Sequence, residues 1–212
     1  MVEILKGVHS IDHSDKGDHS LETWILDCPQ GTVIVDTAMR PESVDKIAAE
    51  LKTMNKTWKD VKLILITHKH GDHVKNLPKI AELTGAPVKA HELEAPLIEK
   101  AVGVKVEGLK DGAILPHCGG IEVIHVPGHS EGNACYLLKA KKALIAGDTV
   151  FGDANGALTA PPEKYCLDVK QATKGIRRLL DYDYDYLIYT HGPDVMKDAK
   201  KKVAELVASC GV

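Results

Sequence analysis

The stretch Thr67-His68-Lys69-His70-Gly71-Asp72-His73 directly follows the apolar run Leu63-Ile64-Leu65-Ile66. Four of its side chains can bind a metal, and they lie within six residues at the end of a predicted buried strand. In an extended segment, His68 and His70 can face one ion, while Asp72 and His73, after a flexible glycine, can turn towards a second. Imidazole and carboxylate are ligands that zinc, iron and manganese accept at sites with open positions. One short segment is therefore able to hold two metals.

Three more metal-capable side chains follow strand-like apolar runs further along the chain. They are His129 in Pro127-Gly128-His129-Ser130, Asp148 in Ala146-Gly147-Asp148-Thr149, and His191 in Tyr189-Thr190-His191-Gly192. A single loop histidine is more often solvated or structural than a ligand, and this is the competing interpretation. The recurrence of the same context favours a metal site.

These motifs resemble those of the metallo-β-lactamase superfamily, whose first metal motif is His-x-His-x-Asp-His. The resemblance extends from Asp36 to His191, and all metal positions can be matched in order. It implies that the first metal is bound by His68, His70 and His129, and the second by Asp72, His73 and His191, with Asp148 bridging the two. Asp36, at the end of Thr32-Val33-Ile34-Val35, matches an upstream aspartate that supports the site without ligating it.

A weak internal repeat indicates the architecture. A strand, Asp-Thr, a helix, a strand and Thr-His occur once over residues 33–68 and again over residues 145–191. The two halves look like copies that meet at one site. We expect an α/β (α+β) fold in which two mixed sheets pack face to face with helices outside, a four-layer αββα sandwich that is also the fold of the resembling family. The absence of a Pro-, Ser- or Gly-rich linker favours one domain over residues 1–212.

Hydrophobic periodicity and turn residues predict the individual elements. Strands are expected at 2–9, 21–27, 32–36, 61–67, 86–90, 121–126, 133–138, 143–146 and 187–190. Helices are expected from Pro41, over 76–83, 94–102 and 169–180, and from Pro193 to Gly211. Residues 151–167 are expected to be irregular. The polar loop between the first two strands contains His13 and His19, which we interpret as solvated histidines, with a place over the metal site as the alternative.

Composition limits the classes of partner. Lys and Arg number 27 against 30 Asp and Glu, without a basic stripe, so we expect no nucleic-acid partner. The five cysteines are odd in number, widely spaced and without a Cys-x-x-Cys pair, which predicts reduced thiols in a cytoplasmic protein. Neither a signal-peptide core nor a membrane-spanning run is found, so we expect no membrane partner. The expected partner is a small-molecule substrate, and a homodimer remains open.

The expected chemistry is hydrolysis. A metal lowers the pKa of its bound water from about 16 to about 7, and hydroxide held between two ions can attack a carbonyl or phosphoryl centre. Asp72 is the expected catalytic residue, because it can accept or relay the proton. Within the superfamily the chain is most similar to glyoxalase II-like and lactonase-like hydrolases, which implies an ester, thioester or lactone-type bond. The short tail after His191 lacks a glutathione-binding helical extension, which argues against a glutathione thioester.

The cofactors implied are two divalent ions, with zinc first and iron or manganese as alternatives. Two other functions remain open. A persulfide dioxygenase of the same fold uses a single iron held by the equivalents of His68, His129 and Asp148, and a non-catalytic metal-binding protein is the third hypothesis. For substrate contacts we single out Tyr165, whose phenol could hydrogen-bond an oxyanion, and Phe151, which could contact an acyl group. Ordinary packing is the alternative for both.

Overall fold

The computed structural model describes residues 2–15, 21–153 and 155–211. The chain forms two compact units, unit 1 from Met1 to Leu109 and unit 2 from Lys110 to Val212. Each unit contains one main mixed sheet, as predicted. The expectation of a single domain over residues 1–212 stays a prediction.

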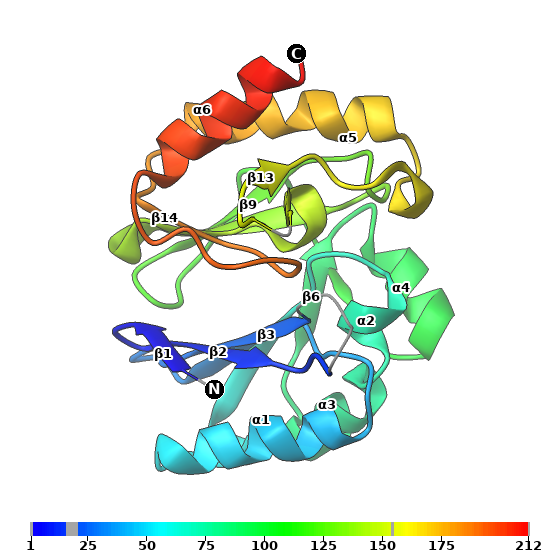
Figure 1. Cartoon of the computed structure of the whole chain (residues 1–212). Helices are drawn as coiled ribbons and strands as arrows, with labels where there is room; N and C mark the ends of the chain where they lie inside the picture. The colour runs from blue at the N-terminus through cyan, green and yellow to red at the C-terminus, as the bar shows by residue number, and fades with distance from the viewer. Residues whose placement is uncertain (1, 16–20, 154, 212) are drawn as a thin grey trace. The chain divides into compact units, whose positions relative to one another are not determined.

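Unit 1 is built on a seven-stranded sheet whose strands follow one another in chain order (Figure 1). The strands are β1 (Val2–Leu5), β2 (Val8–Asp12), β3 (Glu22–Leu26), β4 (Thr32–Val35), β5 (Val61–Leu65), β6 (Val88–His91) and β7 (Glu107–Leu109). Strands β1 to β4 are antiparallel neighbours, and β4 to β7 are parallel neighbours. Because parallel neighbours need long crossover connections, the helices of this unit lie between the parallel strands in sequence.

The helices of unit 1 are α1 (Glu42–Thr53), the short α2 (Gly71–Val74), α3 (Leu77–Thr84) and α4 (Ala95–Val102), with a 3-10 turn η1 (Trp58–Asp60). Helices α1 and α3 cover one face of the sheet (Figure 1). The apolar face of α1 packs into the core, where Ile47 and Leu51 join Ile34 and Ile64. Trp24 is fully buried.

Unit 2 contains a five-stranded sheet in the order β14-β11-β10-β9-β8. Its strands are β8 (Ile114–Leu115), β9 (Ile121–His125), β10 (Ala134–Leu138), β11 (Ala143–Ile145) and β14 (Tyr186–Ile188). Only β11 and β14 are parallel neighbours. The stretch expected to be irregular contains a small hairpin, β12 (Phe151–Gly152) and β13 (Leu158–Thr159). The 3-10 segments are η2 (Lys139–Lys141), η3 (Gly147–Thr149), η4 (Glu163–Tyr165) and η5 (Ile176–Asp181).

The two helices of unit 2, α5 (Val169–Gly175) and α6 (Ala199–Ser209), cover one face of its sheet (Figure 1). The predicted helix over 169–180 changes to the 3-10 segment η5 after Gly175. The predicted start of the C-terminal helix at Pro193 is wrong. Val195 instead forms an antiparallel bridge with Leu187, and Asp198 has a φ of 55°, so that the helix begins only at Ala199.

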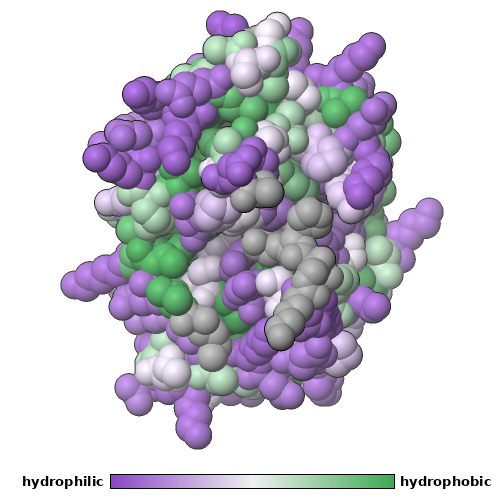
Figure 2. Space-filling view, viewed as in Figure 1, coloured by the Kyte–Doolittle hydropathy of each residue, from purple (hydrophilic) through white to green (hydrophobic). Residues whose placement is uncertain are grey.

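The outer part of α6 carries the exposed residues Lys200, Lys201 and Lys202, in a region where Figure 2 shows hydrophilic side chains. None of the helices in the described part of the chain has the length and apolar character that crossing a membrane requires. The cytoplasmic location stays a prediction.

The cysteines only partly follow the expectation. Cys135, Cys166 and Cys210 are free thiols. Cys28 is disulfide-bonded and so is Cys118, which makes the prediction of five reduced cysteines wrong for these two. The wide spacing of the cysteines in the sequence carries no information about which of them form disulfides.

Candidate metal centre

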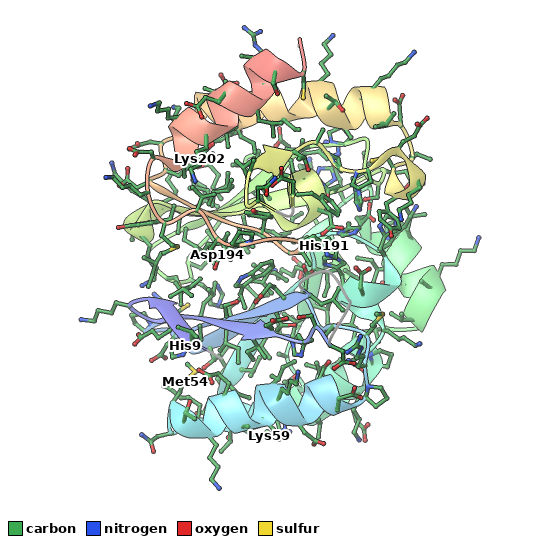
Figure 3. The ribbon with its side chains drawn as sticks, viewed as in Figure 1. His9, Met54, Lys59, His191, Asp194 and Lys202 are labelled. Atoms are coloured by element: carbon green, nitrogen blue, oxygen red, sulfur yellow. The ribbon has the colours of Figure 1, made fainter. Side chains whose placement is uncertain are left out.

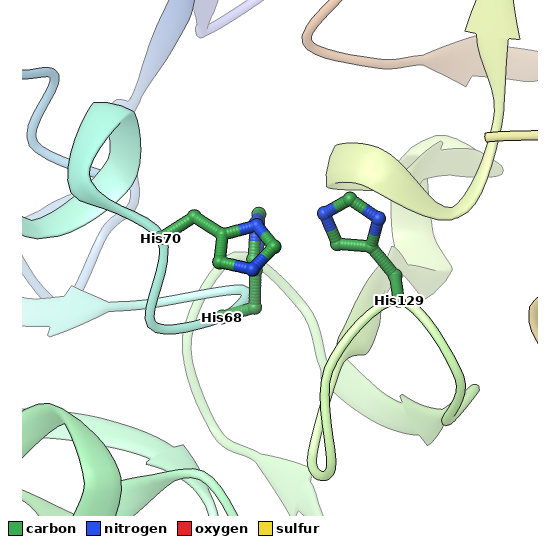
Figure 4. A group of neighbouring side chains, drawn as sticks. All are labelled: His68, His70 and His129. Carbon is green, nitrogen blue, oxygen red and sulfur yellow. The ribbon is translucent and has the colours of Figure 1, made fainter. Parts of the chain in front are cut away.

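In unit 1 the metal motif begins directly after β5, the strand between β4 and β6. His68 Nε2 lies 3.0 Å from His70 Nδ1, and the two rings meet edge to face with an interplanar angle of 82° (Figure 4). Two nitrogens bound to one tetrahedral zinc lie about 3.3 Å apart, given Zn–N bonds of about 2.0–2.1 Å. The two imidazoles therefore fit a shared ion.

The second half of the motif is organised by the buried carboxylate of Asp36. Its Oδ1 accepts a hydrogen bond from the Thr67 backbone N–H at 2.8 Å, and its Oδ2 accepts one from Thr67 Oγ1 at 2.7 Å. The same Oδ2 lies 2.7 Å from His73 Nδ1. A carboxylate at Nδ1 holds the proton there, which leaves the lone pair of Nε2 for a metal. Asp72 Oδ2 lies 3.6 Å from this Nε2.

Asp36 occupies this position through an unusual backbone conformation. Its φ is 60°, in the left-handed region, where aspartate is tolerated better than most residues. Its N–H still donates to the Leu65 carbonyl at 2.9 Å, which continues the parallel pairing of β4 with β5. The turn after β4 thus directs the carboxylate towards the end of β5.

Glu94 is a site residue that the sequence analysis missed. It is fully buried at the start of α4, and its Oε1 accepts a hydrogen bond from the Lys69 N–H at 2.7 Å. This bond holds the turn between His68 and His70. A glutamate before a helix normally indicates an exposed capping residue, so no local signal pointed to this role. His91, three residues before Glu94, is also buried.

In unit 2 the three predicted ligands come from loops after three strands. His129 follows β9 (Figure 4), Asp148 lies in η3 after β11, and His191 follows β14. Asp148 Oδ2 lies 3.3 Å from His129 Nε2 and 3.2 Å from His191 Nε2. One carboxylate oxygen thus faces two imidazole nitrogens, an arrangement that suits an aspartate shared between two ions.

Both units show the internal repeat found in the sequence. Strands β4 and β5 form a parallel pair in unit 1, and β11 and β14 form one in unit 2. Asp36 and Asp148 lie just after the first strand of each pair, and a Thr-His dipeptide follows the second. The carboxyl ends of parallel strands lie at the same sheet edge, so within each unit this brings an aspartate close to a histidine.

The two residues proposed as substrate contacts have different surroundings. Phe151 is buried, and its ring stacks on His191 with centroids 4.7 Å apart and an interplanar angle of 23°. Tyr165 is 43% exposed, and Lys164 Nζ lies 4.5 Å from the centroid of its ring. Phe151 therefore orients a predicted ligand, and the substrate role of both residues stays a prediction.

The thiol of Cys166 lies beside the unit 2 cluster. Its Sγ is 3.8 Å from His129 Nδ1. Burial raises the pKa of the Cys166 thiol, as do the carboxylates of Asp148, Asp168 and Glu163. The thiol is therefore protonated at neutral pH.

His13 is not the solvated loop histidine that the sequence predicted. It is 1% exposed, and neither ring nitrogen has a hydrogen-bond partner among the described residues. Burial, the largest influence, lowers the pKa of its imidazole to about 4, so the ring is neutral at physiological pH. The prediction was wrong because the strand alternation of β2 continues one residue further, so that Ile11 and His13 are buried while Asp12 between them is exposed. His19 lies outside the described residues.

Asp194 follows His191 on the segment after β14 (Figure 3). Burial raises the pKa of its carboxyl to about 6, and a hydrogen bond from the Tyr189 backbone opposes this shift. A buried carboxyl without a strong cationic partner favours its neutral form. The carboxyl of Asp194, three residues after His191, thus titrates at about pH 6, which the sequence did not indicate.

Comparison with known proteins identifies the family. The model of the metallo-beta-lactamase superfamily matches residues 23–192. A metal-dependent hydrolase from Pyrococcus furiosus is 31% identical over 174 residues, which cover 70% of this chain and 76% of that protein. A hydroxyacylglutathione hydrolase from Francisella tularensis subsp. novicida is 31% identical, with coverage of 68% of this chain and 53% of that protein.

The fold is also found in solved structures. A metallo-beta-lactamase family protein from Thermus thermophilus superposes with a TM-score of 0.79 at 21% identity, covering 98% of this chain and 80% of that one. A structure described as a di-iron-bound form superposes with a TM-score of 0.70 at 24% identity, covering 93% and 98%. The expected fold class is therefore confirmed, and the chain belongs to the metallo-β-lactamase superfamily.

Proposed function

We propose that this protein is a metal-dependent hydrolase that uses two divalent ions to cleave a thioester or ester bond of a small molecule. The observation that carries the proposal is the orientation of the imidazoles within each unit. In unit 1, Asp36 holds His73 with Nε2 available, and two further ring nitrogens converge at 3.0 Å. In unit 2, two Nε2 atoms face one oxygen of Asp148. These arrangements suit metal ligands better than solvated histidines.

The assignment of individual ligands follows the family motif. We propose His68, His70 and His129 for the first ion, Asp72, His73 and His191 for the second, and Asp148 as the shared ligand. Zinc is the first candidate because its preferred nitrogen and carboxylate ligands match this set. Iron is the alternative, supported by the neighbour in a di-iron-bound form.

Ions at such a site supply a water of lowered pKa and polarise the scissile carbonyl. The residues of the chain have separate tasks around this chemistry. Asp72, partly exposed next to His73, is placed to accept or relay the proton that the attacking water loses and the leaving group gains. Asp36 keeps His73 in the tautomer that leaves Nε2 unprotonated, and Glu94 holds the turn between His68 and His70.

The names of the relatives support a thioester substrate. Besides the hydroxyacylglutathione hydrolase, an atrochrysone carboxyl ACP thioesterase from a Cryptosporiopsis species is 28% identical over 139 residues. The matched regions cover only 53% and 40% of these two proteins. The parts that this chain does not match can carry their substrate specificity, so the acyl and thiol groups are best sought with a panel.

The test is elemental analysis of protein purified without chelator or added metal, followed by assays on thioesters, esters and lactones. About two divalent ions per chain and turnover of a panel member are expected. Asp148→Ala should lose both ions, whereas His191→Ala should lose chiefly one. His125→Ala is the matched control, since it removes a half-buried histidine of unit 2 outside the motif. Two retained ions and full activity in Asp148→Ala would contradict the assignment, and a single iron with oxygen-dependent persulfide turnover would favour the dioxygenase.

A further inference from the structure

Cys166 has two polar neighbours of different character. Its Sγ lies 3.9 Å from the Pro161 carbonyl oxygen and 3.8 Å from His129 Nδ1. The carbonyl can only accept a hydrogen bond, so the S–H group donates to Pro161. This orientation turns the sulfur lone pairs away from Pro161 and makes them available to His129.

A sulfur acceptor at Nδ1 determines which nitrogen of His129 carries the proton. With Nδ1–H as the donor to Cys166 Sγ, Nε2 retains its lone pair. Nε2 is the nitrogen that lies 3.3 Å from Asp148 Oδ2. The thiol thus prepares the imidazole for a cation on the side of Asp148.

The backbone keeps Cys166 in this place. The Leu167 N–H donates to the His129 carbonyl at 3.1 Å, and the Asp168 N–H donates to the Gly128 carbonyl at 2.8 Å. Gly128 has a φ of 120°, and a Cβ there would lie 2.2 Å from the Ala172 nitrogen in the middle of α5. The loop of His129 and the segment that follows Cys166 are consequently tied together next to the thiol contact.

We infer that Cys166 is a positioning residue that holds His129 in its metal-binding tautomer and ring orientation. The inference rests on the proposed function, in which His129 is a ligand. It also distinguishes the two units, since His73 is oriented by a carboxylate and His129 by a sulfur atom, which is a weaker acceptor. His129 is therefore the less electron-rich ligand, and the ion that it binds should be held less tightly.

The experiment compares Cys166→Ala, Cys166→Ser and the control Cys210→Ala, which removes another half-buried free thiol at the end of α6. Zinc affinities are measured by competition with a chromophoric chelator, and the cobalt-substituted proteins are compared by visible absorption. Loss of an outer partner of a ligand typically costs about 10–100-fold in metal affinity. We expect Cys166→Ala to lower the affinity for the more weakly bound zinc ion about tenfold and to shift the absorption bands of the cobalt protein. Cys166→Ser should recover most of the zinc affinity and of the wild-type spectrum. Cys210→Ala should match the wild type in both measurements.

Equal affinity and an equal cobalt spectrum in wild type and Cys166→Ala would overturn the inference and leave the proposed function intact. A wild-type protein that binds no zinc or cobalt would instead overturn the proposed function. Nitrogen-15 NMR of the metal-free wild type gives an independent test that needs no variant. A proton on Nδ1 of His129 supports the inference, and a proton on Nε2 refutes it even if Cys166→Ala fails to fold.

Discussion

Asp36→Asn is the substitution that most directly tests how unit 1 prepares a ligand. The amide keeps the size of the carboxylate, and asparagine tolerates the left-handed backbone at this position. One oxygen can still accept from the Thr67 N–H. The NH2 group, however, would face His73 Nδ1, where the carboxylate oxygen now lies at 2.7 Å. To avoid two opposed donors, His73 must move its proton to Nε2.

The hydrogen bonds of Asp36 set the expected loss of stability in Asp36→Asn. Asp36 receives three buried hydrogen bonds, two from Thr67 and one from His73. Each hydrogen bond to a charged group contributes about 1.5–3 kcal/mol to stability, and each neutral one about 0.5–1.5 kcal/mol. The loss is partly offset, because removing the charge of Asp36 also removes the cost of burying it. We expect the free energy of unfolding of the metal-free protein to fall by about 1–3 kcal/mol. Zinc affinity should fall by about 10–100-fold, because Nε2 is now protonated.

The assay is urea unfolding of the metal-free protein, followed by tryptophan fluorescence, together with zinc competition against a chelator. Asp60→Asn is the matched control, because Asp60 also accepts hydrogen bonds from the N–H and hydroxyl of one threonine, Thr57, at 2.7 and 2.8 Å, but at the surface. Asp60→Asn should lower the free energy of unfolding by less than about 0.5 kcal/mol and leave the zinc affinity unchanged. Wild-type zinc affinity in Asp36→Asn would refute the proposed role of the carboxylate.

Two further predictions concern unit 2. Gly128→Ala should lower the free energy of unfolding by more than about 3 kcal/mol in urea, because the new Cβ would lie 2.2 Å from the Ala172 nitrogen. The control Gly85→Ala, with a φ of 67° and open space around it, should lower it by only about 1–2 kcal/mol. Similar losses in the two variants would show that the loop of His129 can move away from α5. Asp194→Asn should stabilise the metal-free protein more at pH 7.5 than at pH 5. Because the folded pKa of about 6 lies above the unfolded value of about 3.8, the fold favours the protonated acid, and stability falls as the pH rises between these values. The gain should be about 1 kcal/mol larger at pH 7.5, and a gain independent of pH would contradict the raised pKa of this half-buried carboxyl.

The sequence alone was sufficient for the strands that precede the metal motifs and for the polar residues that follow them, whereas the single strand predicted over 2–9 is two strands, β1 and β2, joined by a turn at Lys6 and Gly7. Apolar runs predict buried strands. A polar residue directly after such a run lies at the edge of the sheet because the strand ends there, and this follows from the local sequence alone. The two parallel pairs, β4 with β5 and β11 with β14, confirm that the repeated Asp-Thr and Thr-His dipeptides follow strand ends within each unit. The metal motif could therefore be recognised before the fold was known.

Apart from Asp36, the groups that orient these residues were decided by tertiary structure. Glu94 contacts Lys69, and Cys166 contacts His129, across separations of 25 and 37 residues. No periodicity or motif links such positions, because their contact depends on how a helix start or a loop packs against a distant turn. The burial of His13 and the late start of α6 have the same origin. Sequence determines which residues can carry the chemistry, and long-range packing determines what holds them in a reactive state.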